Sequence, residues 1–205
     1  MSYLSIVKHY ENCLAVHGDS HKGVDWPNAK DADKRYEVML DLLPSTPRPI
    51  KLLDLGCGAS HLLDFITKNK LKGIEYVGLD ASKDFVRLSR GKNPENRYIC
   101  SDLLKDELPR EQFDYVVING VFTIKGGLSN AEMFEFVVSM LTKVKSLTRF
   151  GFAFNVMSKF VDWERDDLFH LSYDELAEYL TKNISRKFVI RSDYGLYDYT
   201  VYVYL

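Results

Sequence analysis

The chain has 205 residues, of which 46% are hydrophobic and 27% charged, a balance typical of a globular protein rather than a disordered or membrane-embedded one. Its formal net charge of −2 gives no overall positive field that would recruit nucleic acid, and no apolar run approaches the ~20 residues of a transmembrane helix. The N-terminus lacks the pattern of a secretory signal, and Cys13, Cys57 and Cys100 show neither disulfide nor zinc-knuckle spacing. We therefore expect a cytoplasmic protein with reduced thiols, no membrane partner, no metal site and one domain over residues 1–205.

The first clear secondary-structure signal is a helix. Residues 32–43 carry Tyr36, Met39 and Leu40 at helical spacing, and the proline-rich stretch 44–49 ends the helix expected there. After that break, strand-like apolar runs alternate with helix-like segments, which is the pattern of βαβ units in a parallel sheet. The expected strands cover 51–55, 75–80, 97–100, 113–119 and 150–156, and the expected helices cover 60–69, 82–90, 129–145 and 173–183.

The two ends of the chain depart from this alternation. Residues 186–193 and 196–205 alternate with a period of two and are joined by a short link that contains Gly195, which predicts an antiparallel hairpin. The first 30 residues have weaker periodicity and contain three of the five histidines.

A glycine turn at residues 51–66 gives the first functional signal. The expected strand is followed by Gly56, Cys57 and Gly58 and then by a helix, so the turn presents free backbone amides to a ligand above it. A dinucleotide site of the G-x-G-x-x-G type would need a third glycine where this chain has His61. A nicotinamide oxidoreductase is therefore a weaker interpretation.

The pattern D-x-G-x-G-x-S at residues 54–60 instead resembles the first motif of the class I S-adenosylmethionine-dependent methyltransferases, and the resemblance covers the chain from about residue 50 onward. This family implies S-adenosyl-L-methionine as the cofactor. It also implies an α/β fold, a Rossmann-like, doubly wound sheet of seven strands, mostly parallel with an antiparallel C-terminal hairpin. The core would cover residues 50–205, preceded by a helical N-terminal flap at 1–45.

The same resemblance implies cofactor contacts at the ends of the following strands. Asp80, next to Ala81, matches the acid that accepts hydrogen bonds from both ribose hydroxyls, which suits a carboxylate because it has only acceptors. Asp102 matches the acid that accepts from the adenine amino group, and Asn119 with Gly120 matches the loop under the sulfonium. The implied cofactor-binding positions are Asp54, Gly56, Gly58, Ala59, Asp80, Ala81, Ser101, Asp102, Leu103, Asn119 and Gly120.

Four residues have expected supporting roles. Asp54 would order the turn and the methionine amine, and Ser60, which replaces a glycine of many members, would cap the next helix. A looser resemblance of residues 16–40 to the entry segment of some small-molecule methyltransferases implies that Arg35 binds the cofactor carboxylate and that Trp26 walls the pocket. The alternative, a solvated Arg35 and a Trp26 that only anchors packing, remains open.

Methyl transfer needs chiefly alignment and exclusion of water, because the leaving group of a sulfonium is already activated. A hydroxyl acceptor would benefit from a base, and His17, His170 and also His21 are the candidates. Residues 155–176 mix aromatic and charged side chains after the fifth strand, where substrate loops lie in this fold, so they are a candidate acceptor site. That segment contains Phe160, Trp163, Glu164, Phe169, His170 and Tyr173, and it also predicts a helix start with Ser172 as the cap and Glu175 three residues later.

The favoured function is methyl transfer to an oxygen or nitrogen of a small molecule. An RNA or protein methyltransferase, or a cofactor-binding module without activity, stays an alternative. The segment 119–122 reads Asn-Gly-Val-Phe instead of the Asn/Asp-Pro-Pro-aromatic motif of enzymes that methylate base amino groups, which disfavours a nucleic-acid acceptor. The acceptor and the oligomeric state do not follow from the sequence.

Overall fold

The structure is a computed structural model that describes residues 3–46, 48–107 and 111–205. The expected proline-rich break at 44–49 includes residue 47, which lies outside these ranges. The helices are α1 (Leu4–His17), the 3-10 helix η1 (His21–Val24), α2 (Ala29–Leu40), α3 (His61–Lys68), α4 (Lys83–Lys92), α5 (Asn130–Leu147) and α6 (Tyr173–Asn183). The strands are β1 (Ile50–Leu55), β2 (Ile74–Asp80), β3 (Arg97–Cys100), β4 (Phe113–Ile118), β5 (Thr148–Ser158), β6 (His170–Leu171), β7 (Phe188–Arg191) and β8 (Asp198–Tyr204).

One mixed sheet organises these elements in the order β3-β2-β1-β4-β5-β8-β7. The pairs among β1 to β5 are parallel, whereas β8 pairs antiparallel with both β5 and β7, so the expected parallel sheet with an antiparallel C-terminal hairpin is confirmed. The seven expected strands form this path. The additional strand β6 has only two residues and pairs with the end of β5.

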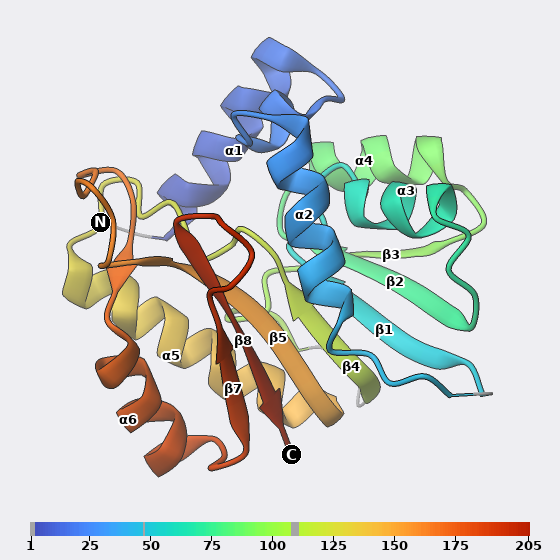
Figure 1. Ribbon diagram of the computed structural model, residues 1–205. Helices are drawn as coiled ribbons and strands as arrows, with labels where there is room; N and C mark the ends of the chain where they lie inside the picture. Colours follow the sequence, from blue (N-terminus) through green and yellow to red (C-terminus); the bar gives the residue numbers. More distant parts are fainter. Residues whose placement is uncertain (1–2, 47, 108–110) are drawn as a thin grey trace.

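Helices cover both faces of the sheet, as the doubly wound arrangement requires (Figure 1). Successive residues of a strand point to opposite faces. In β1, Leu53 packs in the cluster that contains α5 and α6, whereas its neighbour Leu52 packs in the cluster that contains α2 and α3. Both leucines are fully buried, as is expected for a parallel strand covered on both sides.

Helix α1 lies at one end of the sheet, at the top of Figure 1. Helix α1 packs against the core through buried Ile6, and the ring of Tyr3 stacks on Phe136 of α5 with 5.2 Å between the centroids. Helix α2 begins three residues earlier than the periodicity predicts, because Asn28 caps it by accepting a hydrogen bond from the backbone of Asp31 at 2.9 Å. Among the described residues, none of the helices combines the length and apolar character that a bilayer crossing requires.

Candidate functional site

The glycine turn connects the end of β1 to the start of α3. Gly56 and Gly58 have φ values of +74° and +51°, in the left-handed region that favours glycine. A Cβ atom on Gly56 would lie 2.3 Å from Cγ2 of Val121, so the turn also requires glycine for space. Ser60 precedes α3 with φ 61° and makes no side-chain cap. The expected capping role is therefore wrong, because a cap residue normally has extended backbone that aims its side chain at the first helical amides.

Hydrogen bonds within the protein hold the backbone of this turn. The amides of Gly56 and Cys57 donate to the carbonyl of Leu79 at 2.7 and 3.1 Å, and the amide of Gly58 donates to Asp80 at 2.9 Å. The expectation that the turn presents free amides is therefore wrong for these three groups. What the turn offers a ligand is a surface without side chains, onto which a large group can pack closely.

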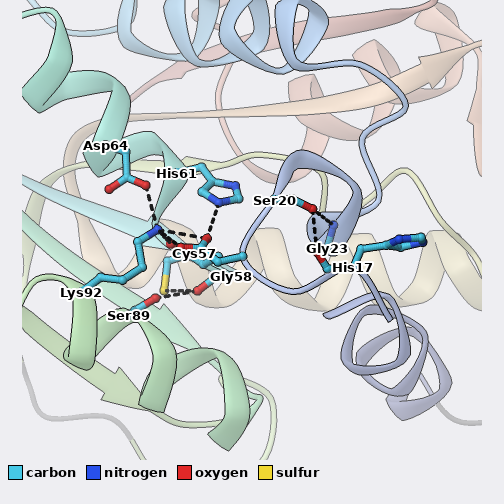
Figure 2. Close-up of polar contacts among 11 residues, drawn as sticks. His17, Ser20, Gly23, Cys57, Gly58, His61, Asp64, Ser89 and Lys92 are labelled. Carbon is cyan, nitrogen blue, oxygen red and sulfur yellow. Dashed lines mark hydrogen bonds and ion pairs between the residues drawn. The ribbon is translucent and has the colours of Figure 1, made fainter. Parts of the chain in front are cut away.

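Side chains of helix α4 hydrogen-bond to the carbonyl groups of the glycine turn (Figure 2). The hydroxyl of Ser89 donates to the carbonyl of Gly58 at 2.8 Å, and Nζ of Lys92 donates to the carbonyl of Ala59, also at 2.8 Å. Lys92 also pairs with Asp64 of α3 at 2.8 Å. These bonds hold the turn in one conformation and tie α3 to α4.

Asp80 ends β2 beside the turn, with both carboxylate oxygens bound to backbone. Oδ2 accepts from the amide of Gly58 at 2.9 Å and Oδ1 accepts from the amide of Ser82 at 2.8 Å. Burial raises the pKa of Asp80, and the two backbone donors act against that shift. Each oxygen keeps a further lone pair, so the carboxylate can still accept from two hydroxyl groups.

Asp102 follows β3 and is in contact with the N-terminal helix segment. Its Oδ2 accepts a hydrogen bond from the hydroxyl of Tyr3 at 2.7 Å, and its Oδ1 accepts from the amide of Leu104 at 3.1 Å. The neighbouring Ser101 donates to Asp106 at 2.8 Å. A ligand amino group at Asp102 would therefore share an oxygen either with the hydroxyl of Tyr3 or with the amide of Leu104.

Gly120, in the loop after β4, is held by hydrogen bonds at both its amide and its carbonyl. The amide of Gly120 donates to Oδ1 of Asn155 at 2.8 Å, and its carbonyl accepts from the hydroxyls of Tyr10 and Thr123 at 2.9 and 2.8 Å. Oδ1 of the preceding Asn119 is buried without a hydrogen-bond partner among the described residues. Such a buried acceptor is a site where a ligand donor would relieve a desolvation cost.

A buried ion pair lies behind this loop. Nε and Nη2 of Arg35 donate to the carboxylate of Asp198 in β8 at 2.7–3.1 Å, and Nδ2 of Asn155 donates to the same carboxylate at 2.8 Å. The guanidinium also stacks over Trp26, 4.3 Å from the ring centroid. Arg35 thus makes its bidentate bond to Asp198 instead of remaining solvated, while its Nη1 is buried and unpartnered within the described part of the chain.

Asp54 is buried at the end of β1 and accepts a hydrogen bond from the hydroxyl of Tyr76 at 2.7 Å. Burial raises its pKa to about 7, although the Tyr76 hydroxyl acts in the opposite direction. The amides of the turn donate to Leu79 and Asp80 instead. The expectation that Asp54 orders the turn is therefore wrong for hydrogen bonds to these amides.

Most of the residues expected to bind the cofactor line one pocket. Its wall includes Trp26, Asp54, Gly56, Gly58, Asp80, Ala81, Ser101, Asp102, Leu103, Asn119 and Gly120. Ala59 and Arg35 lie outside this wall. Sequence reasoning missed the contribution of α1 and the residue before it, namely Tyr3, Ile6, Val7 and Tyr10. Their spacing of three, four and seven residues is a helical signal that could have identified them.

A second pocket shares Tyr10, Val24 and Trp26 with the first. Of the six residues singled out in the expected acceptor segment, Trp163 and His170 line this pocket, whereas Phe169 is buried in the core. Ser172 caps α6 as predicted, since it accepts from the amide of Glu175 at 3.3 Å.

The candidate bases occupy different environments around the second pocket. His170 is buried, with Nδ1 bonded to the carbonyl of Ser158 at 2.6 Å and Nε2 accepting from the amide of Arg165 at 3.3 Å, which is the environment of a structural histidine. His17 lines the same pocket and is exposed at the end of α1, where Figure 2 shows its ring pointing away from the glycine turn. His21 begins η1 and lines neither pocket.

Comparison with known proteins agrees with this arrangement. Residues 53–143 match the model of a methyltransferase domain. Rv1506c of Mycobacterium tuberculosis, whose assignment as a methyltransferase is itself an inference, is 29% identical over 157 residues, which are 76% of this chain and 93% of that protein.

Solved structures show the same fold. The magnesium protoporphyrin IX methyltransferase of Synechocystis with bound S-adenosylmethionine superposes with a TM-score of 0.66 at 16% identity, covering 100% of this chain and 97% of that chain. The plantazolicin methyltransferase BpumL in complex with a pentazolic desmethylPZN analogue and S-adenosylhomocysteine gives a TM-score of 0.61 at 14% identity, covering 98% of this chain and 97% of that chain. With the ordered motifs and the matched domain, these findings support a class I S-adenosylmethionine-dependent methyltransferase.

Proposed function

We propose that this methyltransferase moves a methyl group from S-adenosylmethionine to an oxygen or nitrogen atom of a small molecule by in-line displacement. The observation that carries the proposal is the common wall of the two pockets, formed by Tyr10, Val24 and Trp26. Because the motif residues line the first pocket, an acceptor in the second pocket would approach across this wall, next to Gly120. Holding two reactants in such adjacent sites is the main source of rate in a displacement of this kind.

The residues of the first pocket fit the cofactor by their chemistry. When bound, S-adenosylmethionine supplies a methyl group on a positively charged sulfur that needs no further activation. Asp80 has acceptor capacity for the ribose hydroxyls, and Asn119 Oδ1 is a buried acceptor that lacks a partner among the described residues. Gly56 provides the close surface that a side chain would block. Arg35 lines the second pocket and not the first; its Nη1 is a buried donor without a partner in the described ranges, and we infer that it serves the cofactor carboxylate from that side.

The second pocket supports a small acceptor of mixed character. Its wall carries cationic Lys22 and Arg165 together with anionic Asp25 and Asp31, so no single sign of charge would attract a polyanion such as RNA. Trp163 adds an exposed aromatic surface. The two solved relatives described above are named for acceptors that are small relative to nucleic acid, which agrees with this choice.

Proton removal is a secondary requirement of the proposed reaction. The buried His170 has both ring nitrogens bonded to backbone groups, so it cannot accept a proton without losing one of these bonds. His17 is exposed at the rim of the second pocket and is the histidine we assign to receive a proton from a hydroxyl acceptor.

Calorimetric titration of the full chain with S-adenosylmethionine and S-adenosylhomocysteine, with NAD as the control ligand, tests the cofactor site. Asp80→Asn should weaken binding of both sulfur cofactors by about tenfold or more, because the amide replaces an acceptor of two hydroxyl bonds by a group that also donates. The matched control is Asp84→Asn, which changes an exposed acid of α4 that lines neither pocket. Binding of NAD in place of the sulfur cofactors, or equal affinity in the two variants, would contradict the proposed site.

Transfer of an isotopically labelled methyl group to a panel of small hydroxyl and amino compounds tests the acceptor class. RNA and protein substrates are included as competitors in the same assay. Label in a small compound supports the proposal, whereas label that enters only RNA or protein assigns the acceptor to the alternative class.

A further inference from the structure

Three side chains that commonly bind metals meet where α1 contacts η1. His9 and Cys13 lie one helical turn apart on α1, and Asp25 is the residue that ends η1. Nε2 of His9 is 2.7 Å from Oδ2 of Asp25 and 3.7 Å from Sγ of Cys13, and one ligand atom from each residue lies within 4.8 Å of the other two. Within the described ranges, this is the one group of three or more such side chains that converges in this way.

The separations fit a tetrahedral ion with small adjustments. Zinc binds sulfur at ~2.3 Å, imidazole nitrogen at ~2.0 Å and carboxylate oxygen at ~2.0–2.2 Å, so tetrahedral geometry requires about 3.4–3.6 Å between ligand atoms. The distance between Sγ of Cys13 and Nε2 of His9 is 3.7 Å, close to that range. The pair formed by His9 and Asp25 must open by about 0.7 Å, and both side chains are more than one-third exposed, which leaves room for that movement.

A single nitrogen cannot hydrogen-bond fully to both of its neighbours in this cluster. The same nitrogen, Nε2 of His9, faces both Asp25 and Cys13. If that nitrogen carries a hydrogen, it can donate to the carboxylate but has no lone pair for the thiol; if it lacks the hydrogen, it faces the carboxylate with two acceptors opposed. A cation would satisfy the nitrogen, the oxygen and a thiolate at once, and it would displace the thiol proton on binding.

The backbone at Asp25 is held in an unusual conformation that keeps its side chain at α1. Asp25 has φ 59° and ψ 28°, in the left-handed region, and its amide donates to the carbonyl of Lys22 at 3.0 Å. A non-glycine residue in this region is strained unless local hydrogen bonds offset the cost.

We propose that His9, Cys13 and Asp25 bind one zinc ion that fastens α1 to the η1 turn at the wall of the second pocket. The mixed nitrogen, sulfur and oxygen ligands suit this ion, and three protein ligands leave a fourth position for water or for an atom of a bound molecule. The ion would also fix Tyr10, which follows His9 in α1, lines both pockets and donates to the carbonyl of Gly120. This site is distinct from the proposed cofactor site and does not depend on methyl transfer.

The test is titration of the full chain, without S-adenosylmethionine, by Zn²⁺ in competition with a chromophoric chelator and by Co²⁺ with an absorption readout. We expect one ion per chain and a sulfur-to-cobalt charge-transfer band. Cys13→Ser should abolish the band and weaken zinc binding by about tenfold or more. The matched control Cys100→Ser removes an exposed thiol outside the cluster and should change neither result.

His9→Ala should weaken zinc binding to a similar degree, whereas His17→Ala, which removes an exposed histidine of the same helix, should not. Equal zinc affinity in the wild type and His9→Ala, or a cobalt band that disappears with Cys100→Ser, would overturn the proposal. If Cys13→Ser does not fold, the band in the wild type and in Cys100→Ser still decides the question. Calorimetry with S-adenosylmethionine on the same samples separates failure of the metal site from failure of the proposed function.

Discussion

Replacing Asp198 by Asn removes a charge from a buried ion pair while keeping the size of the side chain. The side chain of Asp198 is 0% exposed and that of Arg35 is 9% exposed, and three donor–acceptor contacts of 2.7–3.1 Å join them. The variant leaves the guanidinium buried without a negative partner. We expect a loss of about 3–5 kcal/mol in the free energy of unfolding, the usual cost of breaking such a pair from one side. Chemical denaturation followed by circular dichroism measures this loss.

Two further variants separate the buried charge from the simple loss of a contact. Asp193→Asn disrupts the pair with Arg191, whose side chains are 69% and 31% exposed, and it should cost less than about 1 kcal/mol. The double variant Arg35→Met/Asp198→Leu removes both charges and should recover most of the stability lost by Asp198→Asn, because no unpaired ion remains. If Asp198→Asn costs no more than Asp193→Asn, the reasoning from burial is refuted.

Asp198→Asn should also affect the proposed cofactor site. Nδ2 of Asn155 donates to Asp198, which orients the amide so that its Oδ1 accepts from Gly120. Asp198→Asn offers Asn155 a donor as well as an acceptor, so the orientation is no longer fixed. We therefore expect weaker binding of S-adenosylmethionine in this variant under conditions where it is fully folded, and unchanged binding in Asp193→Asn.

Two other predictions follow from the first pocket. Burial raises the pKa of Asp54 to about 7 despite the Tyr76 hydroxyl, so the protonated carboxyl stabilises the fold below about pH 4 and this stabilisation is lost as the pH rises through 7. The free energy of unfolding of the wild type relative to Asp54→Asn should fall across that interval, by up to ~4 kcal/mol, and a pH-independent difference would contradict the shift. Gly56→Ala should lower the midpoint of thermal unfolding more than Gly195→Ala. Both glycines have φ near +75°, but only at Gly56 would the new Cβ lie 2.3 Å from Cγ2 of Val121. Equal midpoints in the two variants would argue against this close contact.

The core of the fold was predictable because its signals are local. The alternation of apolar strands with amphipathic helices gave each element of the core within a few residues, and period-two alternation gave the hairpin of β7 and β8. The cap of α6 also follows from Ser172 and Glu175 alone. The strand β6 was not predictable, because two residues carry no periodicity and pair only with the end of β5, beyond the residues of β5 that pair with β4.

The candidate site was predictable to the extent that it lies in motifs. Residues of the glycine turn and of the ends of β2, β3 and β4 line one pocket because the carboxyl ends of parallel strands meet at the same edge of a sheet. Partners that come from distant parts of the chain were not predictable. Arg35 and Asp198 are separated by 163 positions, and nothing in the sequence near Arg35 indicates which carboxylate it meets.

Helix α1 shows why the missing part of the site matters for function. It and the residue before it contact three of the motifs directly: Tyr3 donates to Asp102, Tyr10 donates to the carbonyl of Gly120, and Glu11 accepts from Ser82, two residues after Asp80. The groups that the motifs offer to a cofactor are therefore close to, or the same as, the groups that hold this helix in place. If a cofactor donor binds Asp102 Oδ2 as proposed, it shares that oxygen with the hydroxyl of Tyr3, and cofactor binding would then be energetically coupled to the position of α1. Since Tyr10 lines both pockets, that coupling extends to the proposed acceptor site.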